Sequence, residues 1–307
     1  MDNDLLFDEV LELPDPGAAR RYAALVGLDE VKDRLAKEAR LVLHPSRLTE
    51  WSKRHHGSEL PILTYFQSRP PLFVFAGDVG TGKTTLAETF GNLVAREEGI
   101  AIKLYRLSLN ARGSGTVGEM TQLLSAAFRE VHSAAKKASS AKGKPASGII
   151  LLIDEADALA QSRELGQMHH EDRAGVNALI RGIDALANDQ LPVLIVMCTN
   201  RLGALDPAVR RRAAAIFDFD RPTDEQRSAV LSEGLKGAGL TVKQISEITS
   251  LTGRGDQGYG FTYSDLTQRL LPAIVLDAFP DGPIKFERVR ALTVQMKPTP
   301  PFKESKS

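Results

Sequence analysis

Four apolar runs and one alternating stretch set the pattern of the first two thirds of the chain. The runs cover residues 71–76, 148–153, 192–197 and 215–219, and residues 100–109 alternate between apolar and polar side chains like a further strand. Stretches with apolar residues at helical spacing lie between them. An unbroken run such as 148–153 is expected of a strand that is buried on both faces of a parallel sheet. Strands that alternate with helices predict an α/β domain with a doubly wound parallel sheet, extending to about residue 221.

The two ends of the chain show different patterns. Beyond Arg221-Pro222 the strand signals fade, and four segments are predicted to be helices: 224–236, 241–250, 264–279 and 285–294. At the other end, residues 1–20 carry two prolines and many charges, which favours a loosely held arm. The sequence therefore predicts three parts: an N-terminal arm over 1–24, a large α/β domain over 25–221 and a small helical lid domain over 222–307.

The composition argues against several classes of protein. The 39 basic and 39 acidic residues balance, so no overall field draws the chain to nucleic acid or anionic lipid, and we expect neither as a partner. The single cysteine, Cys198, cannot form an internal disulfide. The acidic N-terminus lacks the features of a signal peptide, and no apolar run approaches the ~20 residues that span a bilayer. We therefore expect a cytoplasmic enzyme with no membrane segment.

A phosphate-binding loop follows the first of the apolar runs: Gly77-Asp78-Val79-Gly80-Thr81-Gly82-Lys83-Thr84. The pattern G-x-x-x-x-G-K-[ST] between a strand and a helix is typical of nucleoside triphosphatases. The glycines let backbone N–H groups turn toward a polyanion, and the helix N-terminus adds a partial positive charge. We expect Lys83 to reach the β- and γ-phosphates and Thr84 to hold Mg²⁺. The chain is predicted to bind a nucleoside triphosphate.

Polar residues follow two of the buried strands. Asp154 and Glu155 come directly after the run at 148–153, and Asn200 comes shortly after the run at 192–197. The carboxyl ends of parallel strands meet at the ligand crevice of an open α/β sheet. Asp154 can accept hydrogen bonds from Mg²⁺-bound water, and Glu155 is placed to orient and deprotonate the attacking water. Asn200, which both donates and accepts, is expected beside the γ-phosphate or that water.

Three consecutive arginines, Arg210-Arg211-Arg212, follow the predicted sheet edge. One interpretation is a solvated helix end whose charges complement the helix dipole. The other is an arginine finger, which a neighbouring subunit inserts to neutralise transition-state charge and which contributes about 10³–10⁵ in rate. Arg211 and Arg212 are the candidates, and this role requires an oligomer.

These motifs together resemble those of the AAA+ ATPases over nearly the whole chain. GDVGTGKT resembles their Walker A motif, IILLIDEAD their Walker B motif, CTN ending at Asn200 their sensor 1, and LDPAVRRR their arginine-finger segment. The resemblance implies ATP and Mg²⁺ as cofactors, with ATP bound between the subunits of a ring, expected to be a hexamer. It also implies nucleotide contacts from Val26 and Gly27, in a segment like the one that lines the family's adenine pocket, and from Leu86 behind the phosphate loop.

Two regions depart from the family's pattern. Residues 260–271 resemble the sensor-2 helix of the lid but lack its arginine at the usual place; Arg269, one turn onward, either substitutes or is an exposed surface arginine. Relatives carry an aromatic residue in the central pore loop, whereas Thr116 and Val117 stand there in this chain. We hypothesise that Thr116 and Val117 grip a substrate only lightly, because they offer little gripping surface. His170, in a second pore loop, is a further candidate for substrate contact.

Shorter matches narrow the resemblance. VNALI at 176–180, with Ile183-Asp184, and the segment from Asp206 to Pro222 resemble the pachytene-checkpoint-type ATPases. Those enzymes remodel HORMA-domain proteins, and their bacterial relatives accompany cyclic-nucleotide signalling operons that defend against phage. The resemblance therefore implies a ring whose pore loops pull on a protein partner, a HORMA-domain protein, and disassemble or unfold it.

Other functions stay open at this point. A general AAA+ unfoldase or severing enzyme is the main alternative, and the missing pore aromatic counts against it. A DNA-directed loader would ordinarily show a basic lid or an added DNA-binding domain, and neither is evident. A nucleotide-gated scaffold would tolerate loss of Glu155 or Asn200, yet both are present. The lysine-rich segment 134–147 is either a partner contact or a solvated loop that extends a helix.

Overall fold

The computed structural model describes residues 6–108, 119–139, 145, 147–159, 170–256 and 258–302, with backbone alone at 119 and 170–172. The chain divides into two compact units, which are treated separately below. The first unit contains Met1–Ala23, Glu30–Ala76 and Thr84–Phe217, and the second contains Ala24–Asp29, Gly77–Lys83 and Asp218–Ser307.

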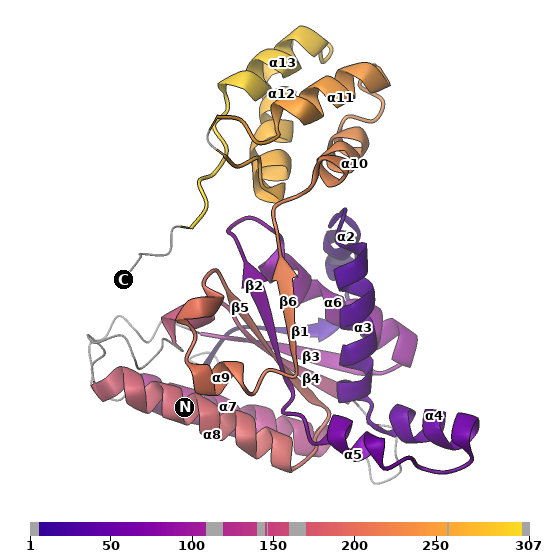
Figure 1. Ribbon diagram of the computed structural model, residues 1–307, viewed down its shortest axis with the longest axis vertical. Helices are drawn as coiled ribbons and strands as arrows, with labels where there is room; N and C mark the ends of the chain where they lie inside the picture. Colours follow the sequence, from indigo (N-terminus) through magenta and orange to yellow (C-terminus); the bar gives the residue numbers. More distant parts are fainter. Residues whose placement is uncertain are drawn as a thin grey trace. The chain divides into compact units, whose positions relative to one another are not determined.

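A six-stranded sheet is the centre of the first unit, in the order β1-β3-β4-β5-β2-β6 (Figure 1). Its strands are β1 (Phe7–Leu13), β2 (Leu72–Gly77), β3 (Ala101–Leu107), β4 (Ser147–Ile153), β5 (Val193–Thr199) and β6 (Ala215–Phe219). β3 pairs with β4, β4 with β5 and β5 with β2, all in parallel. All of β5, and β4 beyond Ser147, is buried, as the apolar runs require. The predicted α/β class with a parallel core is confirmed.

The first strand corrects the prediction for the beginning of the chain. The sequence favours a loosely held arm there, but Phe7–Leu13 forms an edge strand antiparallel to β3. Phe7 and Leu13 are buried, and the ring centroids of Phe7 and Tyr105 lie 4.9 Å apart. The residues between them are mostly acidic and exposed, which hides the strand pattern. The sheet is therefore mixed rather than wholly parallel.

Helices cover both faces of this sheet (Figure 1). α7 (Glu119–Ala138) and α8 (His170–Asn188) share one face, and α3 (Asp29–Leu43) and α6 (Lys83–Glu98) lie on the other. α7 and α8 approach closely: a Cβ on Gly182 would lie 2.4 Å from the ring of Phe128. Shorter helices are α2 (Pro16–Ala23), α4 (Ser46–His56), α5 (Ile62–Gln67) and α9 (Pro207–Arg210). Among the described residues, no helix is long and apolar enough to cross a membrane.

The lysine-rich segment begins as a continuation of α7, which runs as far as Ala138. There Lys136 Nζ lies 3.3 Å from Asp189 Oδ2, and His132 Nε2 lies 2.7 Å from the same oxygen. The rest of the segment lies outside the described residues, apart from Ser139, Pro145 and Ser147. The described part therefore extends a helix, as one of the two interpretations expects.

The second unit is helical after residue 219, in agreement with the fading of the strand signals. Its helices are α10 (Asp224–Gly234), α11 (Val242–Leu251), a π-helical segment (Asp265–Leu270), α12 (Leu271–Ala278) and α13 (Phe286–Gln295). Capping boxes fix two of the helix starts, with Thr223 and Gln226 before α10 and Thr241 and Gln244 before α11. Each predicted helix lies within a few residues of an observed one.

Candidate nucleotide-binding and hydrolysis site

The phosphate loop takes a conformation that only glycine accommodates easily. Gly80 and Gly82 have φ values of +73° and +94°. A Cβ on Gly80 would lie 2.8 Å from Thr262 Oγ1 and 2.9 Å from Ser264 Cβ. The Ser264 backbone N–H also donates to the Gly80 carbonyl at 3.0 Å. The loop is thus packed closely against the start of the sensor-2-like segment of the same unit.

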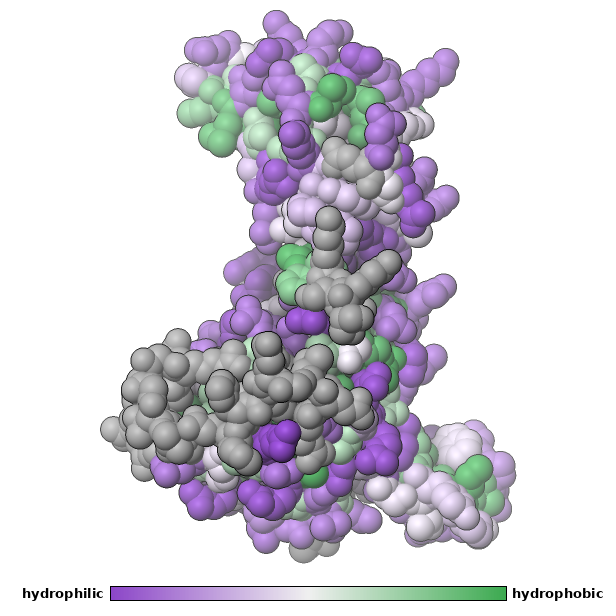
Figure 2. Space-filling model, turned by 60° about the vertical axis from the view of Figure 1, so that its left-hand side comes forward, coloured by the Kyte–Doolittle hydropathy of each residue, from purple (hydrophilic) through white to green (hydrophobic). Residues whose placement is uncertain are grey.

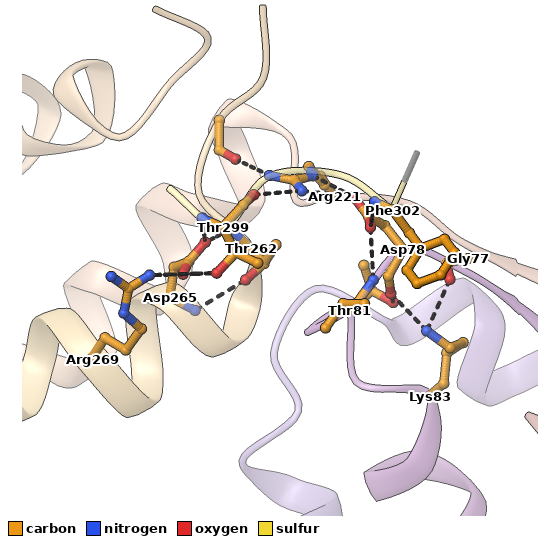
Figure 3. Close-up of polar contacts among 12 residues, drawn as sticks. Gly77, Asp78, Thr81, Lys83, Arg221, Thr262, Asp265, Arg269, Thr299 and Phe302 are labelled. Atoms are coloured by element: carbon orange, nitrogen blue, oxygen red, sulfur yellow. Dashed lines mark hydrogen bonds and ion pairs between the residues drawn. The ribbon is translucent and has the colours of Figure 1, made fainter. Parts of the chain in front are cut away.

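The loop's main-chain carbonyls hold Lys83 in place. Lys83 Nζ donates to the carbonyl oxygens of Gly77 at 3.0 Å and of Asp78 at 2.6 Å. Thr81 Oγ1 donates to the same Asp78 carbonyl at 2.8 Å. Thr81 and Lys83 are both buried. The predicted phosphate-binding lysine is therefore oriented by the loop that it serves (Figure 3).

Thr84 and Asp154 meet in the first unit, as the predicted Mg²⁺ ligands should. Thr84 Oγ1 donates to Asp154 Oδ1 at 3.3 Å. Arg106 lies beside this pair, with Nη2 3.7 Å from Asp154 Oδ2 and Nη1 2.8 Å from Glu88 Oε1. Burial raises the pKa of Glu88, and Arg106 opposes that rise. A hydroxyl and a carboxylate are the hard oxygen donors that suit Mg²⁺.

Glu155 occupies a strained backbone position directly after Asp154. Its φ and ψ are 49° and 42°, in the left-handed region, which costs a residue other than glycine about 1–3 kcal/mol. Its backbone N–H donates to Asp154 Oδ1 at 3.0 Å, and its side chain is exposed. Such strain is found at functional positions, so the geometry agrees with the role predicted for this carboxylate.

Asn200 directly follows β5, the strand beside β4, at the edge of the sheet where Asp154 and Glu155 follow β4. β4 and β5 are parallel, with Ile153 beside Met197, so Asp154 and Asn200 follow adjacent strand ends. Thr199 Oγ1, next to Asn200, donates to Asp157 Oδ1 at 3.0 Å. Among the described residues, none hydrogen-bonds to the amide of the half-buried Asn200. The sheet therefore brings together the carboxylates and the amide that the sequence predicts for this site.

The two candidate finger arginines have different surroundings. Arg212 is bound on both sides of its guanidinium: Nε and Nη2 donate to Asp184 at 2.6 and 2.9 Å, and Nη1 donates to the Ala208 carbonyl at 2.9 Å. The hydrogen bonds that Arg212 donates to the Asp184 carboxylate raise the pKa of Arg212. Arg211 is exposed, and its side chain forms no ion pair or hydrogen bond with the described part of the chain.

The segment expected to contact adenine lies in the second unit. Gly27 has a φ of +80°, and its carbonyl accepts hydrogen bonds from Gln226 Nε2 at 2.5 Å and Tyr263 Oη at 3.5 Å. Burial, together with the charge of Asp29, raises the pKa of Tyr263 to about 12, so this phenol stays protonated and donates. Val26 is half-buried beside Gly27.

Two other residues are predicted to contact the nucleotide, and the structure shows what surrounds each of them. The Leu86 side chain is fully buried in the core of the first unit, which leaves only its backbone for a nucleotide contact. Arg269 Nη1 donates to Asp265 Oδ1 and to the Lys297 carbonyl, at 2.5 and 3.2 Å. The structure therefore shows Arg269 as a side chain tied to the lid.

The predicted pore residues lie largely beyond what the structure describes. Thr116 and Val117 fall outside the described residues. His170 begins α8, but its side chain is also outside them. Their proposed contacts with a substrate therefore remain predictions from the sequence.

Sequence reasoning missed one residue of the site, Arg221. Its Nε donates to Asp78 Oδ2 at 2.7 Å, inside the phosphate loop (Figure 3). Asp78 itself could have indicated such an arginine. A carboxylate in a phosphate-binding loop repels the phosphates unless a cation beside it neutralises its charge. The sequence alone could not say which arginine supplies that cation.

Comparison with known proteins agrees with this geometry. Residues 73–221 match the family described as "ATPase family associated with various cellular activities (AAA)". Together with the full-length relatives below, this match shows that the chain belongs to the AAA family of ATPases. It is 53% identical over 300 residues to CD-NTase-associated protein 6 of Escherichia coli (strain MS 115-1), covering 97% of this chain and 96% of the relative.

Two solved structures are similar over nearly the full length. A chain from the structure of the E. coli MS115-1 HORMA:CdnC:Trip13 complex is 52% identical, with a TM-score of 0.93 and coverage of 99% of both chains. The structure of Rhizobiales Trip13 is 47% identical, with a TM-score of 0.76, covering 96% of this chain and 100% of that one. The chain is therefore an AAA-family ATPase with close Trip13-type relatives, and it binds ATP.

Proposed function

We propose that this ATPase works as a ring of identical subunits, a hexamer, that opens or unfolds a HORMA-domain protein in bacterial antiphage signalling. The observation that carries the proposal is the similarity, at 52% identity over 99% of both chains, to a chain of the HORMA:CdnC:Trip13 complex. The relative called CD-NTase-associated protein 6 supports the same setting. The ring would act in the cytoplasm on a protein rather than on nucleic acid or membrane.

The hydrolysis chemistry assigns one role to each group of the site. Lys83 would bind the β- and γ-phosphates of a bound nucleotide, and Thr84 and Asp154 would hold Mg²⁺, Asp154 by way of water. When bound, the metal neutralises the charge that develops on the phosphates. Glu155 orients the attacking water and takes its proton, and Asn200 hydrogen-bonds the γ-phosphate or that water. The 3.3 Å approach of Thr84 Oγ1 to Asp154 Oδ1 supports this assignment.

Arg211, rather than Arg212, is proposed as the finger that completes the neighbouring subunit's site. A finger must extend from its own subunit, and Arg212 is held by two bonds to Asp184 and one to the Ala208 carbonyl. Arg211 is exposed at the end of α9, and its fixed charge suits transition-state stabilisation in trans.

An exposed apolar strip of the second unit supports the idea of a ring. Val275, Leu276, Phe279 and Val294, on or beside α12 and α13, are 55–75% exposed. Figure 2 shows hydrophobic residues gathered on the surface of this unit. Large apolar side chains that are exposed close together are typical of a protein contact. We assign it to the contact between neighbouring subunits.

The adenine and pore contacts complete the proposal. Val26 and Gly27 would line the adenine, with the Gly27 carbonyl held by Gln226 and Tyr263. Thr116 and Val117 of the central pore loop, with His170 of the second, would transmit the pull to the partner. Their small gripping surface favours a brief pull on one segment over processive unfolding.

The test is steady-state ATP hydrolysis with and without a HORMA-domain protein, using Glu155→Gln as the blank. We expect the partner to stimulate turnover of the natural chain and to leave the blank inactive. Robust hydrolysis at the same rate with and without the partner would agree with the ATPase assignment. It would contradict the HORMA-domain partner and favour a general unfoldase.

A further inference from the structure

Asp78 places a carboxylate inside the phosphate loop, where a negative charge opposes the binding of a polyanion. Arg221 neutralises it: its Nε donates to Asp78 Oδ2 at 2.7 Å, and the two side chains are only 15% and 17% exposed. Such a partly buried pair is screened less than a surface ion pair. The two residues are 143 positions apart in the chain, so the fold brings them together.

Arg221 uses its remaining donors on two other segments of the same unit. Nη1 donates to the Gly260 carbonyl at 2.6 Å and Nη2 to the Thr299 carbonyl at 2.7 Å. The guanidinium carbon also lies 5.0 Å from the centroid of the Tyr259 ring. The planar fork of an arginine can hold three acceptors at once, which a lysine cannot do with the same geometry.

The segment that supplies the Thr299 carbonyl, residues 297–302, is here called the strap. Its Thr299 N–H and Oγ1 donate to the buried Asp265, at 3.0 and 2.7 Å. Its Phe302 N–H donates to Asp78 Oδ1 at 3.1 Å. The strap is therefore bonded at Asp265 in the lid and at Asp78 in the phosphate loop (Figure 3).

Asp78 connects these contacts to the phosphate-binding lysine. Its carboxylate accepts from Arg221 and from the strap, while its main-chain carbonyl accepts from Lys83 Nζ at 2.6 Å and Thr81 Oγ1 at 2.8 Å. A displacement of the Asp78 side chain would thus also shift the Asp78 main-chain carbonyl, which orients Lys83.

We infer that Arg221 and the strap are positioning elements of the nucleotide site: together they neutralise Asp78 and hold the phosphate loop in the form that binds ATP. The inference rests on the proposed nucleotide chemistry of Lys83 and is independent of the HORMA partner. It assigns a role in ATP binding to residues 297–302, far in sequence from the phosphate loop.

The test measures the binding of a fluorescent ATP analogue with Mg²⁺ to the full chain carrying Glu155→Gln, so that hydrolysis does not interfere. Arg221→Gln should weaken binding about tenfold or more, because a charge-assisted bond is lost and Asp78 is left uncompensated. Arg221→Lys should recover part of the loss, since it restores the charge without the fork. Arg254→Gln is the matched control, an exposed arginine of the same unit that bonds to none of these groups.

A second substitution separates positioning from support of the fold. Adding Asp78→Asn to Arg221→Gln removes the repelling charge, so binding should return to within about threefold of Asp78→Asn alone. A merely structural role would leave the double variant at least as weak as Arg221→Gln, and that result would overturn the inference. Binding by Arg221→Gln within about twofold of the parent would overturn it too.

The strap is tested at one backbone N–H. Phe302→Pro removes the donor to Asp78, whereas Phe302→Ala keeps it and serves as the control. Binding should weaken several-fold in the proline variant relative to the alanine variant, and equal affinities would contradict the role of the strap. If the HORMA-domain protein fails to stimulate ATP hydrolysis by the natural chain while that chain binds ATP normally, the proposed remodelling fails and this inference stands.

Discussion

Replacing Arg211 by alanine should affect turnover, whereas replacing the adjacent Arg212 by alanine should affect stability. Arg211→Ala removes the proposed finger and should lower turnover about 10³-fold or more, with little change in the melting temperature. Arg212→Ala breaks two bonds to Asp184 and one to the Ala208 carbonyl. It should destabilise the chain while keeping most of the ATPase activity.

The size of the Arg212 effect follows from its exposure. The side chains of Arg212 and Asp184 are 28% and 42% exposed, so the ion pair is worth at most about 1 kcal/mol. The bond to the Ala208 carbonyl adds about 1 kcal/mol. A total of about 1–2 kcal/mol corresponds to a fall of about 3–6 °C in the melting temperature. Asp184→Ala removes only the ion pair and keeps the bond to the Ala208 carbonyl, so it should produce about half of that fall or less.

Mixing variants tests whether Arg211 acts between subunits. Neither Arg211→Ala nor Glu155→Gln alone should hydrolyse ATP, but a mixture should recover part of the activity. In mixed rings, some sites combine an intact Glu155 with an intact Arg211 from the neighbour. The control mixture, Glu155→Gln with the double variant, has no site with an intact Glu155 and should stay inactive. The assignment would be refuted if Arg211→Ala alone were fully active while Arg212→Ala alone were inactive and regained activity on mixing with Glu155→Gln.

Three further predictions address the site and the fold. Glu155→Gln should keep ATP binding and ring assembly but abolish turnover, as nucleotide titration and a phosphate-release assay would report; near-normal hydrolysis would contradict its role. Gly80→Ala should cost about 1–3 kcal/mol and weaken ATP binding, because its Cβ would meet Thr262 at 2.8 Å, and an unchanged unfolding midpoint would argue against the close packing. Burial raises the pKa of Glu98, but hydrogen bonds from His44 and Arg47 outweigh burial and hold that pKa below its usual range. The stability that the ionised Glu98 gives to the fold should be present above about pH 4.3 and be lost as the pH falls through the lowered pKa of Glu98. Urea titrations should therefore show that Glu98→Gln costs stability at pH 7 and little at low pH.

Much of the α/β unit could be predicted because its signals are local. The buried strands read as unbroken apolar runs, and their carboxyl ends carry Asp154, Glu155 and Asn200 at one edge. β1 escaped prediction because its exposed residues are mostly acidic, so only its antiparallel pairing with β3 identifies Phe7–Leu13 as a strand.

The remaining features of the site depend on contacts between distant residues. Arg211 and Arg212 are equivalent in the sequence, and Asp184, 28 positions upstream, distinguishes them. In the same way, the pairing of Arg221 with Asp78 joins residues 143 positions apart. No periodicity or spacing in the chain encodes either contact.

The most direct test of the proposed function measures the release of a labelled peptide from a HORMA-domain protein by substoichiometric amounts of this ATPase. The account predicts that each ring releases many peptides, that release requires ATP, and that Glu155→Gln releases none. Release that proceeds equally with Glu155→Gln, or no release despite active ATP hydrolysis, would contradict the proposal that hydrolysis remodels this partner.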